Sequence, residues 1–164
     1  MGGSTAMKRF LFLAFIFVLV VCIVPSSFAD KALMYNDVRA DPSANVDDPY
    51  DLDSSNYSAS FGFKNYSATM AIKYASGVTV SLNATYINFQ SSASVPVTIK
   101  AYYWNGSYWI NSGYSNTISV NKTATNYGPY TITGLSSNKP FYIKLSKTQY
   151  TGYKCKGTIV VEGN

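Results

Sequence analysis

Apolar and polar residues alternate with a period of two along most of the chain after residue 56. The alternation is regular in residues 57–63, 78–86, 97–103 and 141–146. This period predicts β-strands, because successive side chains of a strand point to opposite faces, whereas a helix repeats every 3.6 residues. One apolar face per strand is typical of antiparallel sheets with one side in solvent.

Turn signals separate these runs. They are Lys64-Asn65, Ser76-Gly77, Asn105-Gly106, Gly128-Pro129, Asn138-Lys139-Pro140 and Thr151-Gly152. The spacing predicts an all-β fold, a single antiparallel β-sandwich of about eight to nine short strands. Both immunoglobulin/fibronectin-like and jelly-roll-like connectivities fit this pattern.

One short stretch resembles a known family. Tyr130-Thr-Ile-Thr-Gly-Leu135, followed after five residues by Phe141-Tyr142-Ile-Lys-Leu145, resembles the E–F corner of a fibronectin type III domain. The resemblance favours an immunoglobulin-like topology and implies no function.

The N-terminus has the three parts of a secretory signal peptide. Lys8 and Arg9 precede the apolar run 10–24, and Ser27-Phe28-Ala29 fits a small-x-small cleavage site. The run is shorter than the ~20 residues of a spanning helix. We therefore expect residues 1–29 to be cleaved, leaving an extracellular chain without a transmembrane segment. An uncleaved membrane anchor is the alternative.

Cysteine and histidine usage excludes several kinds of site. The chain has no His, so a Ser-His-Asp triad and any His-ligated metal are excluded. Cys22 lies in the signal peptide, which leaves Cys155 alone in the mature chain and without an internal disulfide partner. Its role is either structural or that of a thiol that pairs between chains.

Charge divides the mature chain into two parts. Residues 30–53 hold seven Asp against two basic residues, whereas residues 54–164 hold nine Lys against Glu162. We predict an acidic leader arm or linker over 30–55 and the sandwich over 56–164. Clustered carboxylates could bind calcium, and the weak candidates are Asp47, Asp48, Asp51 and Asp53. A loose arm that leans on the basic body is the other interpretation.

Catalysis is not expected. General acid–base chemistry needs positioned titratable groups, and the predicted sandwich contains one acid, Glu162, close to the C-terminus. We expect a protein that is not an enzyme and needs no cofactor.

The most specific local feature is the segment 100–111, which contains the hairpin signal Asn105-Gly106. A two-residue turn would pair Trp104 with Ser107, Tyr103 with Tyr108, Tyr102 with Trp109 and Ala101 with Ile110. Ala101, Tyr103, Tyr108 and Ile110 would then point inward. The opposite, outward face holds the candidate ligand-binding residues Tyr102, Trp104, Trp109, Lys100 and Asn111.

An outward row of two Trp and one Tyr has two interpretations. It could be a flat platform on which sugar rings stack, because aromatic area is costly to leave in water. It could instead be a cross-strand cluster that stabilises the hairpin, or it could be covered by another segment.

Lysines gather near the C-terminus without a neighbouring acid. Lys139, Lys144, Lys147, Lys154 and Lys156 are candidates for contact with an anionic surface, such as a wall polymer or lipid headgroups. Solvated lysines that protect edge strands are the alternative. No nucleic-acid-binding motif is present, so no nucleic-acid partner is expected.

Together these features favour a secreted, non-catalytic binding module for a carbohydrate or cell-surface polymer. The first alternative is a structural or assembly protein of an extracellular layer. The second is a small secreted antagonist or toxin-like protein.

Overall fold

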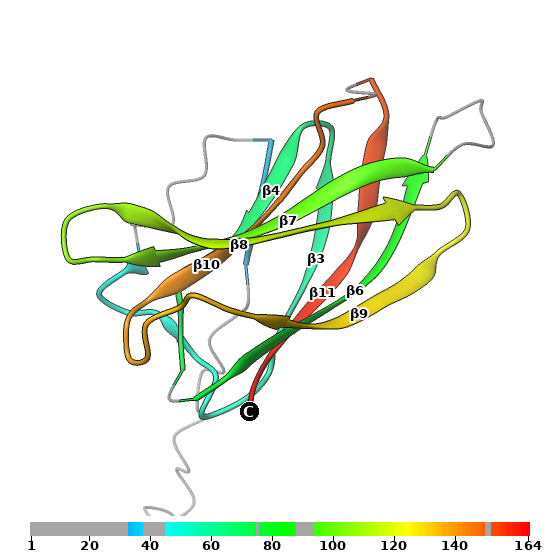
Figure 1. Cartoon of the computed structure of the whole chain (residues 1–164). Coiled ribbons are helices and arrows are strands. Elements are labelled where there is room, and N and C mark those ends of the chain that lie inside the picture. Colours follow the sequence, from blue (N-terminus) through cyan, green and yellow to red (C-terminus); the bar gives the residue numbers. More distant parts are fainter. Residues whose placement is uncertain (1–32, 38–44, 75, 88–93, 150–151) are drawn as a thin grey trace, which may run out of the picture. The chain divides into compact units, whose positions relative to one another are not determined.

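A computed structural model describes residues 33–37, 45–74, 76–87, 94–149 and 152–164 (Figure 1). The chain divides into two units, residues 1–31 and 32–164, and the second contains everything described here. The expected signal peptide, with Cys22, lies outside the described residues. Among the residues that are described, no helix has the length and apolarity needed to cross a membrane.

All elements of the described residues are β-strands, which confirms the all-β prediction. They are β1 (Met34–Asn36), β2 (Tyr50–Asp51), β3 (Tyr57–Phe63), β4 (Tyr66–Thr69), β5 (Ile72–Lys73), β6 (Val78–Ile87), β7 (Val95–Trp104), β8 (Trp109–Val120), β9 (Thr125–Ile132), β10 (Phe141–Ser146) and β11 (Lys154–Gly163).

The strands form two sheets. The first sheet contains β1, β2, β4, β5, β7, β8 and β10, and the second has the order β3-β11-β6-β9. In the first sheet, β10 lies between β7 on one side and β4 and β5 on the other, and β8 follows β7 at the edge. Every pair is antiparallel except β2 with β5.

The pairing is nested about the loop between β7 and β8. β7 pairs with β8, β6 with β9, β4 with β10 and β3 with β11, so the chain resembles one long hairpin. This hairpin folds back on itself through the pairs β7–β10 and β6–β11. The last strand therefore lies between β3 and β6 in the second sheet.

That position of β11 differs from the expected immunoglobulin-like topology. In an immunoglobulin-type sandwich the last strand joins the sheet of the strand that follows the E–F corner. Here that strand is β10, in the first sheet, and its neighbours are β7, β4 and β5. The local resemblance at residues 130–145 does not extend to the connectivity.

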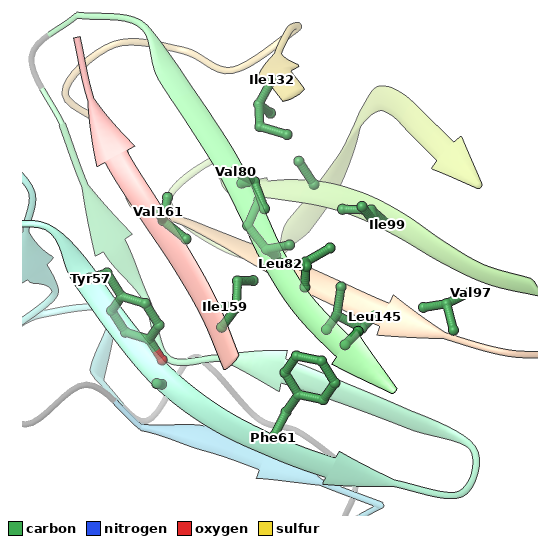
Figure 2. Packing of buried hydrophobic residues seen from close by; sticks show 14 of the residues in the cluster. Tyr57, Phe61, Val80, Leu82, Val97, Ile99, Ile132, Leu145, Ile159 and Val161 are labelled. Carbon is green, nitrogen blue, oxygen red and sulfur yellow. The ribbon is translucent and has the colours of Figure 1, made fainter. Parts of the chain in front are cut away.

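The inward residues of both sheets form one hydrophobic cluster. Figure 2 shows Phe61, Leu82 and Ile159 of the second sheet near Ile99 and Leu145 of the first. Burial alternates strictly along β3 and β10, as their period of two predicts. Because the inner faces form the hydrophobic cluster, a binding site on the sheets would lie on one of their outer faces.

Part of the acidic leader is folded, which corrects the prediction of an arm over 30–55. β1 pairs with β4, and β2 pairs with β5. Tyr50 and Leu52 are only 7% and 6% exposed and belong to the hydrophobic cluster. The Tyr50 hydroxyl donates to the Asn56 carbonyl oxygen at 2.9 Å. Strands of two or three residues are too short for alternation to reveal them, and residues 38–44 lie outside the description.

Candidate functional site

The β7–β8 hairpin differs from the predicted one in its turn. Trp104 pairs with Trp109 and Tyr102 with Asn111, so the loop has four residues, 105–108, and the predicted two-residue turn is wrong. The side-chain oxygen of Asn105 accepts hydrogen bonds from the backbone amides of Ser107 and Tyr108, both at 2.9 Å. Asn105 thus closes the wider loop with its side chain.

The register is shifted by two residues, and the faces are therefore those predicted. Tyr102, Trp104 and Trp109 lie on the outer face of the first sheet, because a strand repeats its face every second residue. Tyr108 is the exception. It was expected to point inward, but it lies in the loop and is 61% exposed.

Four aromatic side chains meet on this outer face, and we call them the aromatic cluster: Tyr102, Trp104, Trp109 and Tyr142. Tyr142 comes from β10, where it pairs with Tyr102. The two tyrosine rings stack with centroids 4.9 Å apart and planes 7° apart. Trp109 meets Tyr142 edge-on at 4.9 Å, and Trp104 meets Trp109 at 5.2 Å and 61°.

The aromatic cluster is interlocked and not flat. All four side chains are partly buried and their rings meet at different angles, so the hairpin does not build the flat platform that was one interpretation of the row. Burial, with a smaller contribution from Tyr102, raises the pKa of Tyr142 to about 12. The indole Nε1 of Trp109 is buried and has no hydrogen-bond partner among the described residues. Such a donor costs on the order of 1–3 kcal/mol.

Two lysines adjoin the aromatic cluster. Lys100 of β7 and Lys144 of β10 are directly opposite each other, one same-face position from the pair Tyr102–Tyr142. The Lys144 ammonium lies 5.0 Å from the centre of the Tyr66 ring. The next row contains Thr98, whose hydroxyl is 3.1 Å from that of Thr117.

Asn111 is the fifth predicted ligand-binding residue, and its side chain has a local role. Its Oδ1 accepts a hydrogen bond from the Gly113 amide at 2.9 Å. Gly113 has a φ of 86° and lies where β8 has extra residues opposite β7. Asn111 therefore supports the bulge of β8, and its side-chain amide group remains for other contacts.

The five lysines predicted to contact an anionic surface do not come together. Lys144 is on the outer face of the first sheet, Lys154 and Lys156 are exposed on the second, and Lys139 lies in the loop before β10. Lys147 is only 5% exposed, which corrects its assignment to a contact surface. Burial lowers the pKa of Lys147, although nearby Cys155 and Asp37 oppose that shift.

The four aspartates of the weak calcium candidate are not gathered either. Asp51 forms an ion pair with Lys73 at 3.0 Å, while Asp47, Asp48 and Asp53 are exposed. Among the described residues, no three acidic or cysteine side chains lie close enough to hold a metal ion.

Cys155 faces the core and not the surface. The thiol is free and buried, and burial raises its pKa to about 12. Pairing with a second chain would require the fold to open around it, so the structural interpretation of this cysteine is favoured.

Tyr142 is the residue that the sequence interpretation missed. Alternation in 141–146 already puts Tyr142 and Lys144 outward. Only the pairing of β10 with β7, which are distant in the chain, brings them beside Tyr102 and Lys100.

Comparison with known proteins found no matching family model, curated protein or solved structure.

Proposed function

We propose that this chain is a secreted, non-catalytic binding module and that its aromatic cluster binds carbohydrate. The supporting observation is that four aromatic side chains from three strands gather outside the hydrophobic core, on the outer face of a sheet. Partly exposed Tyr and Trp rings offer apolar faces to sugar C–H groups, together with polar ends for hydroxyls. Extracellular location is part of the proposal and rests on the N-terminal signal.

The fold is consistent with this use. We infer that the two sheets pack as a β-sandwich with jelly-roll connectivity, since they share one core and their strands pair in a nested order. A sandwich of this kind leaves two outer faces for binding. Fold alone does not assign a function, so the difference between these faces matters.

The outer face of the second sheet provides the contrast. Its described residues are mostly small and polar, with two lysines and no aromatic ring: Ser58, Ser60, Thr79, Ser81, Asn83, Thr85, Lys154, Lys156 and Thr158 are among them. Aromatic residues are thus concentrated on one outer face and are not a general property of a Tyr-rich chain. This asymmetry favours a binding surface.

Retention of residues 30–164 on insoluble polysaccharides and isolated cell walls tests the proposal. We expect Trp104→Ala to weaken retention roughly tenfold, which corresponds to about 1.4 kcal/mol. Tyr108→Ala is the matched control, because it removes an aromatic side chain that is exposed and outside the aromatic cluster. Thermal melts of both variants establish that they fold.

Two results would contradict carbohydrate binding by the aromatic cluster. One is unchanged retention of a folded Trp104→Ala variant. The other is an equal loss in Tyr108→Ala, which would indicate non-specific adhesion of aromatic surface.

An exposed edge strand favours self-assembly as a second function. Among the described strands β8 pairs with β7 alone, and its twelve residues include no charged side chain and no proline. The other long edges are interrupted or covered: β9 contains Pro129, and on β3 the Gly62 amide donates to the Asn36 side chain. Proteins usually protect such edges with charge, proline or a bulge. β8 has a bulge at Gly113, and the Tyr127 hydroxyl donates to the Ser119 carbonyl oxygen near its end, so the stretch between Gly113 and Ser119 is the edge proposed for pairing.

Sedimentation over a wide concentration range tests assembly through β8. We expect the protein to self-associate and Thr117→Lys, which adds a charge to β8, to remain monomeric. Thr158→Lys adds the same charge to the exposed face of β11, a central strand, and should self-associate like the parent. A parent protein that is monomeric throughout removes this second function.

A further inference from the structure

We infer that the bound carbohydrate is acidic and that Lys100 and Lys144 hold its carboxylate or sulfate group. This inference rests on the proposed function and names the ligand class of the same site. It is carried by the position of two like charges beside the aromatic cluster.

The two lysines are placed unfavourably for stability alone. They are direct cross-strand neighbours in the β7–β10 register, and like charges in that position are destabilising. Among the described residues the ion pair observed is Lys73–Asp51, so neither Lys100 nor Lys144 is neutralised by a carboxylate. A bound anion in contact with both lysines would offset this unfavourable pairing of like charges.

The spacing suits an extended sugar chain. Same-face rows along a strand are about 7 Å apart, so the Lys100–Lys144 row lies one sugar-sized step from the stacked Tyr102 and Tyr142 rings. A sugar in contact with the aromatic cluster can therefore place an acidic group, its own or its neighbour's, beside Lys100 and Lys144. Beyond them, Thr98 and Thr117 offer hydroxyls for further contacts.

The side chains are also held near the surface. Both lysines are partly buried, which indicates stems that lie along the sheet while the charged ends reach solvent. The Lys144 ammonium lies over the Tyr66 ring of β4, on the side of β10 that is away from Lys100, and this contact orders the side chain. Partial order of this kind lowers the entropy lost when an anion binds.

The experiment compares polygalacturonate with its methyl ester, which has the same sugar without the charge. Dextran sulfate serves as a sulfated probe. Two double variants lose equal charge: Lys100→Gln/Lys144→Gln beside the aromatic cluster, and Lys154→Gln/Lys156→Gln on the other sheet. Trp104→Ala is measured in parallel, and all proteins are compared in low and moderate salt.

We expect the parent protein to bind an acidic probe at least tenfold more tightly than the methyl ester. Lys100→Gln/Lys144→Gln should remove that preference, whereas Lys154→Gln/Lys156→Gln should keep it. Preference for dextran sulfate over polygalacturonate assigns the lysine pair to sulfate, and the reverse assigns it to carboxylate.

Three results would overturn the inference. They are equal binding of the ester and the acid, an equal loss in both double variants, and no retention of any probe. Equal binding of acid and ester that Trp104→Ala abolishes would leave carbohydrate binding intact and reject only the acidic ligand. If binding of the acidic probe requires the lysine pair but is unchanged in Trp104→Ala, the proposal that the aromatic cluster binds carbohydrate is rejected instead.

Discussion

At the scale of single residues, Tyr142 connects the packing of the aromatic cluster to a measurable property. It stacks on Tyr102 and meets the edge of Trp109. Burial of the side chain is the main cause of its raised pKa, because a phenolate formed there would lose hydration. The pKa of Tyr142 is therefore raised to about 12 from an ordinary value near 10.

Trp109→Ala should lower the pKa of Tyr142, because it uncovers the phenol. A raised pKa in the folded state contributes stability that is complete below pH 10 and is lost as the pH rises toward 12. Ultraviolet titration of the phenolate, taken as the difference between the parent and Tyr142→Phe, isolates this group from the other tyrosines. The same difference is taken in the Trp109→Ala background.

The ultraviolet difference signal that Tyr142→Phe removes should titrate near pH 12 in the parent protein. In the Trp109→Ala background the same signal should titrate closer to pH 10. A difference that titrates near pH 10 in the parent would show that the aromatic cluster does not form as described. A difference that does not move in Trp109→Ala would show that Trp109 does not cover Tyr142.

Lys147 shows that the charge of a single residue does not predict its burial unless its position in the strand pattern is also considered. Grouping it with other lysines by composition assigned it to the surface, yet it continues the inward series Phe141, Ile143 and Leu145. Alternation extended by one step beyond β10 would have placed it inward. The charge of Lys147 suggested a surface position, whereas its place in the alternation after β10 puts it on the buried face.

At the scale of elements, the β7–β8 hairpin shows which predictions are robust. The turn type was wrong, but an error of two residues keeps every side chain on its face, whereas an error of one would reverse them. The outward assignment of Tyr102, Trp104 and Trp109 survived for that reason. The loop length depended on the Asn105 side chain, whose hydrogen bonds the Asn-Gly signal does not specify.

The rest of the candidate site depends on pairing between distant strands. β7 and β10 are separated by two strands in the chain, and their register alone places Tyr142 beside Tyr102 and Lys144 beside Lys100. Period-two patterning gives the face of each strand but not its neighbours. The sequence could therefore predict the members on the hairpin, but it named Lys144 only as one of a group of lysines and did not bring Tyr142 into the site.

At the scale of the whole molecule, the folded leader changes what the domain is. The sequence boundary at residue 56 followed the change in charge, but Tyr50 of β2 and Leu52 belong to the hydrophobic cluster. The Leu52 amide donates to the Lys73 carbonyl oxygen at 3.1 Å, and its side chain lies against Gly163 at the end of β11. The leader thus joins β5 to the C-terminal strand, which is a long-range contact that charge patterning does not reveal.

Leu52→Ala measures this contribution of the leader to stability. Truncation of a buried leucine removes apolar contact and leaves a cavity, so we expect a loss of about 2–5 kcal/mol in the free energy of unfolding, measured with urea. Ser54→Ala, an exposed change two residues away, should stay within about 0.5 kcal/mol of the parent. If the leader contacted the rest of the domain only through its charges, Leu52→Ala would not change the free energy of unfolding. Added salt would instead weaken the contact between the leader and the domain. A loss below about 0.5 kcal/mol would therefore restore the domain boundary at residue 56.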